Sequence, residues 1–244
     1  MAAVLLPESG GRPYSNTPTR SAANTTSNSP GALAMVRFGA LGSELTCLEN
    51  DAQLDDYAYR VAGSVGEFWT AITLQNELSG DIQDTQTFDS LGIRFGKALQ
   101  MTNILRDIPA DLALGRCYIP SDRLLEMGLN HQELNNPDSI EKFRPLYDSY
   151  LDLTCDYYDS AINYIRMIPR KYRSLRMACL LPVVIGLETI ALLRNGNVLD
   201  AADRIKVKRA KIRKIAIACV ISTRSKAIEN RILSKASNRA KNGA

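Results

Sequence analysis

Hydrophobic residues recur at helical spacing through most of the chain beyond about residue 45. Between 139 and 167 the apolar positions that follow this spacing are Phe143, Leu146, Tyr150, Leu153, Tyr157, Ile162 and Ile165. The same pattern predicts helices over roughly 50–78, 86–114, 121–127, 139–167, 170–194 and 208–233. Strand-like alternation is scarce. We therefore predict an all-α fold whose long helices form a bundle around a central cavity.

The 244 residues divide into three parts by composition. Residues 1–40 are rich in Ser, Thr, Asn, Gly and Pro without a hydrophobic period, which predicts a disordered segment. Residues 41–233 carry the helical pattern and predict one folded domain. Residues 234–244 are expected to form a polar, basic tail.

Charge is distributed unevenly along the chain. Residues 200–244 hold 13 Lys and Arg against 3 Asp and Glu, whereas the rest holds 17 basic and 23 acidic residues. An acidic body with a basic end favours an anionic partner such as a diphosphate, a membrane surface or nucleic acid. The basic end contains no aromatic residue on which a base could stack, so we expect no nucleic-acid partner.

The composition bounds the chemistry further. The five cysteines lie far apart and fit no zinc or disulfide pattern, which favours a cytoplasmic location. The single histidine, His131, lies in a polar stretch and is expected to be a solvated loop residue. The longest apolar run, Met177–Leu193, is interrupted by Pro182 and Glu188 and predicts no membrane span.

A polar stripe follows one side of the predicted helix 86–114. With 100° per residue, Gln100, Asn103, Asp107 and Asp111 lie within about 80° of one another. Such a stripe normally faces water. Alternatively it faces a cavity, where Asp107 and Asp111 would share a hard cation, because Mg²⁺ binds carboxylates together with substrate phosphates.

The same segment contains two arginines and a proline. The forked donors of Arg106 and Arg116 suit phosphate oxygens. Pro109 removes a backbone donor, so we expect a kink between the two aspartates or an early end of the helix.

A second segment, Tyr57–Gly66, combines small residues with aromatic ones. Gly63 and Gly66 each cost about 1 kcal/mol within a helix and leave a slim surface. Either another helix packs closely there or a ligand approaches. If another helix packs there, Tyr57 and Tyr59 are ordinary half-buried aromatic residues.

Three ordered segments together resemble the squalene/phytoene synthase family. The first reads Tyr57-x-x-x-Val61-Ala62-Gly63-x-Val65-Gly66. The second reads Gln100-x-x-Asn103-x-x-Arg106-Asp107-x-x-x-Asp111 and continues to Gly115-Arg116-x-Tyr118-x-Pro120. The third comprises Ala178–Pro182, Thr189–Leu192 and Ile205–Arg209, and it resembles squalene synthases more than phytoene synthases.

The resemblance implies an isoprenoid-synthase fold and head-to-head prenyl transfer. Two farnesyl diphosphates would give presqualene diphosphate and then squalene, with Mg²⁺ and NADPH. The alternatives are phytoene synthesis from geranylgeranyl diphosphate, dehydrosqualene synthesis, or a truncated non-catalytic paralogue. The last arises because the family's first aspartate-rich motif, expected upstream of Tyr57, has no counterpart, so the domain is predicted to be N-terminally incomplete.

The resemblance also assigns roles to individual residues. Tyr57 would be the active-site tyrosine, and Asp107 and Asp111 would bind the metal and its diphosphate. The substrate would contact Val61, Gly63, Gln100, Asn103, Arg106, Arg116, Cys179 and Pro182. NADPH would contact Lys206 and Lys208. Because substrate and product are apolar, we also expect peripheral membrane contact.

Overall fold

The computed structural model describes residues 46–243, and most of them are helical. The helices are α2 (Asp51–Ala58), the π-helical turn η1 (Tyr59–Gly63), α3 (Ser64–Asn76), α4 (Thr85–Arg106), α5 (Ile108–Ala113), α6 (Ser121–Glu126), α7 (Ile140–Met167), α8 (Arg173–Asn195), α9 (Arg209–Ser222) and α10 (Lys226–Asn242). Short 3₁₀ turns, η2 (Glu133–Asn135) and η3 (Pro137–Ser139), precede α7. The predicted all-α fold is confirmed. The predicted disordered segment 1–40 lies outside the described residues.

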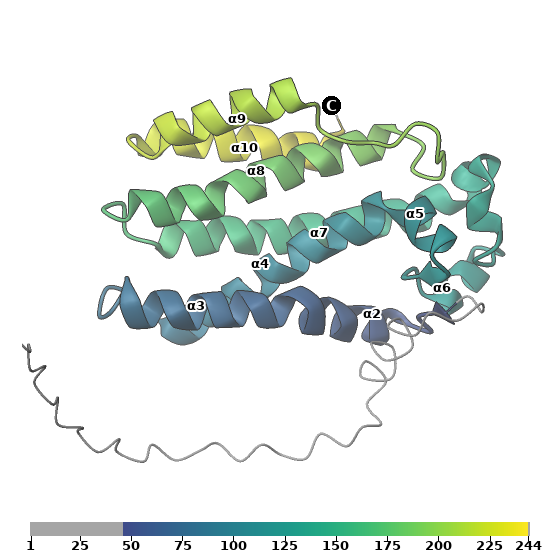
Figure 1. Cartoon of the computed structure of the whole chain (residues 1–244), viewed down its shortest axis with the longest axis horizontal. Helices are drawn as coiled ribbons and strands as arrows, with labels where there is room; N and C mark the ends of the chain where they lie inside the picture. The colour runs from purple at the N-terminus through teal and green to yellow at the C-terminus, as the bar shows by residue number, and fades with distance from the viewer. Residues whose placement is uncertain (1–45, 244) are drawn as a thin grey trace, which may run out of the picture.

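The long helices lie roughly side by side in layers (Figure 1). Helices α2 and α3 form one side, α4, α7 and α8 lie in the middle, and α9 with α10 covers the opposite side. The short elements α5 and α6 gather at one end of the bundle. At this end, two short parallel strands pair with each other, β1 (Thr46–Cys47) and β2 (Arg116–Cys117).

The predicted helix 50–78 forms one nearly continuous run that contains a π-helical turn. Its start is capped by Asn50, whose side chain accepts a hydrogen bond from the backbone N–H of Gln53 at 3.0 Å. The turn η1 covers the Val61–Gly63 part of the tyrosine motif. A π turn inserts one residue relative to an α-helix, so it changes which side chains share a face.

Glycines bring α3 and α4 into backbone contact. A Cβ atom built on Gly66 would lie 2.1 Å from the backbone oxygen of Gly92, and one on Gly96 would lie 2.0 Å from that of Ala62. Neither position therefore has room for a larger residue. The close-packing interpretation of Gly66 is correct, and it holds the two helices at the separation that leaves a cavity beside them.

Helix α4 ends where the proline predicted a kink. Arg106 is the last residue of α4, and α5 starts at Ile108 with Pro109 in its first turn. The hydroxyl of Tyr147 on α7 donates a hydrogen bond to the backbone oxygen of Leu105 at 2.9 Å, which fixes this end of the helix. The break places Asp107 between two helices instead of inside one.

The C-terminal region differs from the prediction. Residues 208–233 form two helices, α9 and α10, because the chain turns at Thr223–Ser225, where Ser225 caps α10. The boundary predicted at residue 233 falls inside α10, whose Ala236 and Ala240 are buried. The predicted tail 234–244 is therefore largely part of the bundle.

The basic charge of this region is partly used within the fold. Arg239 pairs with the buried Glu188 on α8 at 2.7 Å, and Lys241 pairs with Asp159 on α7 at 2.7 Å. Arg204, before α9, pairs with Asp107 at 2.7 Å. These contacts neutralise acidic groups of the bundle and reduce the charge left for an external anion.

Helix α8 is long and apolar enough to cross a membrane by length and composition. About 56% of its most apolar stretch is buried within the bundle, against α4, α7, α9 and α10. A buried core helix meets the same criterion, so the length of α8 gives no support for a membrane span.

Candidate functional site

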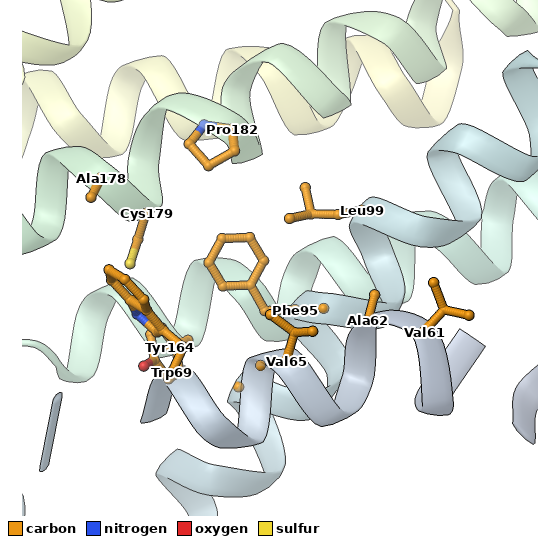
Figure 2. Close-up of a pocket in the computed structure, with 13 residues that line it drawn as sticks. Val61, Ala62, Val65, Trp69, Phe95, Leu99, Tyr164, Ala178, Cys179 and Pro182 are labelled. Atoms are coloured by element: carbon orange, nitrogen blue, oxygen red, sulfur yellow. The ribbon is translucent and has the colours of Figure 1, made fainter. Parts of the chain in front are cut away.

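An apolar cavity of about 370 Å³ lies between α3, α4 and α8 (Figure 2). Its walls come from all three helices, with Tyr164 of α7 beside them. The lining residues are Val61, Ala62, Val65, Gly66, Trp69, Gly92, Phe95, Gly96, Leu99, Tyr164, Ala178, Cys179 and Pro182. No Asp, Glu, Lys or Arg side chain is among them, so this cavity suits a hydrocarbon chain.

Three of the four predicted channel residues line this cavity, namely Val61, Cys179 and Pro182. Gly63 does not. A Cβ atom at Gly63 would lie 3.4 Å from the side chain of Ile93 on α4, so Gly63 belongs to the helix contact instead of the cavity wall. The π turn explains this difference, because it shifts the face of the residues it contains.

One end of the cavity is closed by a contact between α3 and α8. Figure 2 shows Trp69 and Cys179 reaching toward each other from these two helices. Burial raises the pKa of the Cys179 thiol to about 12, and a hydrogen bond from Trp69 offsets part of that rise. The thiol is therefore neutral at physiological pH and serves as part of an apolar wall.

Beyond Leu99, the last residue of α4 that lines the cavity, the same stripe of the helix carries polar and charged side chains. At 100° per residue, the cavity residues and the polar residues near the C-terminus of α4 share a stripe about 120° wide. Along the helix this stripe contains Gly92, Phe95, Gly96, Leu99, Asn103, Arg106 and Asp107. The face is apolar first and polar afterwards, so it matches a ligand with an apolar tail and an anionic head.

Asp107 is held by two arginines. Arg106 donates from Nε to Asp107 at 3.0 Å, and Arg204 donates from Nη2 at 2.7 Å. Burial raises the pKa of Asp107, but these two partners outweigh it and hold the pKa below its usual value. The carboxylate is ionised and already has cationic partners.

Asp111 has a different environment. Burial and the negative charge of Asp107 raise its pKa to about 6, and Arg116 and Arg106 offset part of that effect. Among residues 46–243, no hydrogen bond or ion pair reaches the Asp111 carboxylate. Asp111 is thus a half-buried acid with free lone pairs beside a second carboxylate, and an added cation would stabilise its ionised form.

Tyr57 lies close to this acid. It is only 8% exposed, and its hydroxyl donates to the hydroxyl of Tyr118 at 3.1 Å. Burial raises the pKa of Tyr57, with Tyr118 and the charge of Asp111 adding to the effect. Tyr57 therefore keeps its hydroxyl proton at physiological pH, and it lies near Asp111 and Arg116.

The remaining predicted head-group residues differ in their exposure and position. Gln100 is half-buried and Asn103 is exposed on α4. Arg116 is half-buried in β2, close enough to lower the pKa values of both Tyr57 and Asp111. The structure thus brings Tyr57, Asp111 and Arg116 together, and it places Asn103 and Asp107 on the neighbouring face of α4.

A separate cavity of about 240 Å³ lies between the α4–α5 junction and the segment before α9. It is lined by Arg106, Asp107, Pro109, Ala110, Ala113, Val198, Asp200, Ala201, Arg204 and Ile205. Lys206 and Lys208 follow directly in the chain and are exposed. Neither lysine lines this cavity, so their predicted contact with NADPH remains a prediction.

The sequence did not single out several residues of the site. Arg204 is separated from Asp107 by 97 positions, and no local pattern relates them. Trp69 and Phe95 continue the helical registers of Val65 and Leu99, which is a signal that could have identified them. Tyr118 was noted only as part of the motif, although it contacts Tyr57.

A divalent cation fits the donor set only with help from a ligand. Within the described part of the chain, no three Asp, Glu, His or Cys side chains form a group that could hold a metal. Asp107 and Asp111 supply two carboxylates. Mg²⁺ commonly uses one or two carboxylates and completes its shell with phosphate oxygens and water. The residues present therefore fit Mg²⁺ that arrives with a diphosphate.

The fold and the site define an all-α protein with an apolar cavity and, further along the same stripe of α4, a cluster of carboxylates and arginines. The comparisons with known proteins identify its family. Residues 41–214 match the squalene/phytoene synthase family, and the chain belongs to that family.

Three curated relatives match about half of the chain or a little less. A bifunctional lycopene cyclase/phytoene synthase of Neurospora crassa is 35% identical over 129 residues, which cover 52% of this chain and 21% of that protein. A presqualene diphosphate synthase of Zymomonas mobilis is 40% identical over 106 residues, covering 43% of this chain and 31% of that protein. A 15-cis-phytoene synthase of Synechocystis is 33% identical over 127 residues, which cover 50% of this chain and 37% of that protein.

A solved squalene synthase shows the same fold. The complex of TcSQS with the ligand BPH1237 superposes with a TM-score of 0.70 at 19% identity. The match covers 86% of this chain and 58% of that chain. The chain therefore spans about a fifth to two fifths of the curated relatives and under two thirds of the solved structure.

Proposed function

We propose that this chain binds prenyl diphosphates and takes part in their head-to-head condensation, as a squalene-synthase-like transferase of prenyl groups. The family consists of head-to-head prenyl transferases. The observation that supports the proposal is the single face of α4 that runs from the apolar cavity at Leu99 to Arg106 and Asp107.

Different residues would bind the hydrocarbon tail and the diphosphate head group of the substrate. The apolar lining of the cavity would hold the hydrocarbon chain, and the aromatic side chain of Phe95 would offer a π face to positive charge that develops on an allylic carbon. At the other end, Arg106 and Arg116 would hold the diphosphate oxygens through charge-assisted hydrogen bonds. Tyr57, which donates its one hydroxyl proton to Tyr118 in this structure, would turn that hydroxyl toward the departing group to donate a hydrogen bond to it.

Asp107 and Asp111 would hold Mg²⁺ together with the diphosphate, and the metal would neutralise the charge that develops on that leaving group. The two carboxylates differ in how readily they could bind the metal. Asp107 must share its carboxylate with Arg106 and Arg204. Asp111, whose pKa is raised to about 6, is mostly ionised near pH 7, and its neighbour Arg116 favours that form.

The product is proposed to be squalene, formed from two farnesyl diphosphates through presqualene diphosphate with NADPH as reductant. Lys206 and Lys208 are the proposed NADPH contacts, because both are exposed beside the cavity at the α4–α5 junction. Phytoene or dehydrosqualene formation is the enzymatic alternative. We place the protein in the cytoplasm, with peripheral membrane contact through which the apolar substrate would enter.

The experiment is product analysis with and without Mg²⁺. We expect diphosphate release from farnesyl diphosphate only with Mg²⁺, and squalene only when NADPH is added. Mass analysis with farnesyl and geranylgeranyl diphosphate separates squalene, dehydrosqualene and phytoene. Asp107→Asn should lower release at least about a hundredfold, since it removes one ligand of the leaving-group cation. Asp138→Asn, an exposed acid in η3, is the control.

A second candidate function is prenyl diphosphate binding without turnover. It is favoured by the presence of only two carboxylates at the site within residues 46–243. Binding without Mg²⁺-dependent release would support this alternative. Undiminished release in Asp107→Asn would contradict the role assigned to Asp107.

A further inference from the structure

Two cavities meet at one aromatic side chain. The apolar cavity of about 370 Å³ shares Trp69 and Ala178 with a second cavity of about 610 Å³. The second cavity lies between the end of α3 and the start of α8. Trp69 comes from α3 and Ala178 from α8, so these two residues face each other across the boundary between the cavities (Figure 2).

The position of the Trp69 side chain is fixed by contacts with its surroundings. The indole reaches toward the thiol of Cys179 on α8 (Figure 2). The backbone oxygen of Trp69 accepts a hydrogen bond from Thr73 at 3.0 Å, in addition to its place in α3. Trp69 therefore spans from one wall of the cavity to the other, even though 44% of its surface remains exposed.

The two cavities differ in chemistry beyond this boundary. The first is lined without charged side chains, whereas the second combines apolar Ile72 and Leu175 with charged Glu77, Lys171 and Arg173. The apolar members, Ile72 and Leu175, lie on the same two helices as Trp69 and Ala178. A hydrocarbon chain that passed Trp69 would therefore meet a further apolar surface before it reached the charged groups.

We propose that Trp69 sets the length of prenyl chain that the cavity accepts. This inference rests on the proposed function, in which the diphosphate lies at Arg106 and Asp107 and the tail points toward Trp69. A tail that ends before Trp69 fits within the first cavity. A tail longer by one isoprene unit collides with the indole, and a smaller side chain at residue 69 opens the passage to Ile72 and Leu175.

The test compares the affinities for two substrates in matched variants. Isothermal titration with Mg²⁺ gives the Kd values of the complete chain for the thiolo analogues of farnesyl and geranylgeranyl diphosphate, in which sulfur replaces the bridging oxygen so that the diphosphate is not released during the measurement. In Trp69→Ala, the ratio of the two Kd values should shift at least about tenfold in favour of geranylgeranyl diphosphate, because five further carbons become buried. Phe68→Ala is the control, since Phe68 is 67% exposed on the same helix and lines neither cavity.

A reverse variant guards against a general loss of structure in Trp69→Ala. Ala178→Phe adds bulk to the opposite side of the passage and should shift the ratio toward farnesyl diphosphate. Circular dichroism melting of each variant reports whether it is folded. Trp69 is the single tryptophan of the chain, so its fluorescence in the wild type should change when farnesyl diphosphate binds.

The outcomes of this test distinguish a failure of the inference about Trp69 from a failure of the proposed function. If the wild type binds neither diphosphate, the proposed function fails. If it binds farnesyl diphosphate but folded Trp69→Ala and Ala178→Phe keep the wild-type ratio, the inference fails and the proposed function stands. An equal shift in Phe68→Ala would also overturn the role of Trp69.

Discussion

The apolar cavity and the charged cluster lie on one face of α4, yet they differ in how completely the described residues build them. The cavity has walls from α3, α4 and α8 and contains no charged side chain. The cluster has two carboxylates, and one of them is already paired with Arg106 and Arg204. The proposed tail site thus has walls from three helices, whereas the proposed head site depends on its ligand.

This difference follows from the forces that form each region. The cavity results from backbone contact between glycine-bearing helices, which needs no partner outside the bundle. The head cluster concentrates like charges, which are costly together unless counter-charges reach them. Arginines supply the counter-charge to Asp107, and burial favours the neutral form of Asp111.

The largest expected effect comes from breaking the helix contact that forms the cavity. Gly66→Ala should lower the free energy of unfolding by about 3 kcal/mol, because its Cβ would meet the Gly92 oxygen at 2.1 Å. The measurement is urea denaturation followed by circular dichroism. In an exposed helix interior the same substitution would stabilise by about 1 kcal/mol, so the sign itself tests the contact.

Ala71→Val on the exposed face of α3 is the control for this prediction and should change the stability by less than about 0.7 kcal/mol. A Gly66→Ala variant as stable as the wild type would show that α3 and α4 can separate freely. In that case the cavity would not be a fixed feature of the fold.

The sequence predicted the tail site better than the head site, for physical reasons. Helical periodicity and the two glycines Gly63 and Gly66 are local signals, and they indicated that another helix could pack closely on α3. Pro109, also a local signal, predicted the break after Arg106. The family resemblance assigned Gly63 to the substrate, whereas the structure places it in the π turn η1 and in contact with α4. No local pattern could predict that Arg204 reaches Asp107.

The end of α9 shows the same limit. Apolar residues continue through 208–233 without a proline or glycine, so one helix was expected. The structure turns at Thr223–Ser225 because α10 must fold back to pack on α8, where Arg239 reaches Glu188. A tertiary contact determined that boundary, and a local sequence pattern does not contain it.

A smaller effect should separate the two regions directly. Arg106→Gln should weaken binding of farnesyl diphosphate about tenfold while leaving farnesol binding unchanged, because it removes a charge-assisted donor to phosphate and no part of the cavity wall. Fluorescence of Trp69 measures both ligands. Arg213→Gln, exposed on α9, is the control. Equal losses for farnesol and its diphosphate would show that the tail and head sites are not independent.

The smallest expected effect concerns the competition for Asp107. Arg204 is 61% exposed in its pair with Asp107, so the pair contributes under about 1 kcal/mol. Its removal in Arg204→Gln should free a carboxylate oxygen and strengthen Mg²⁺-dependent binding of farnesyl diphosphate up to about fivefold. A Mg²⁺ titration at constant farnesyl diphosphate measures the change, and Arg209→Gln in α9 is the control.

The opposite result would be equally informative, because it would change the role of Arg204. Weaker binding in Arg204→Gln would mean that Arg204 holds the diphosphate itself, and that Asp107 orients it. The double variant Arg204→Gln with Asp107→Asn distinguishes these cases. If Arg204 only competes with the metal, its removal has no effect once Asp107 has lost its charge; if it binds the diphosphate, the loss persists in the Asp107→Asn background.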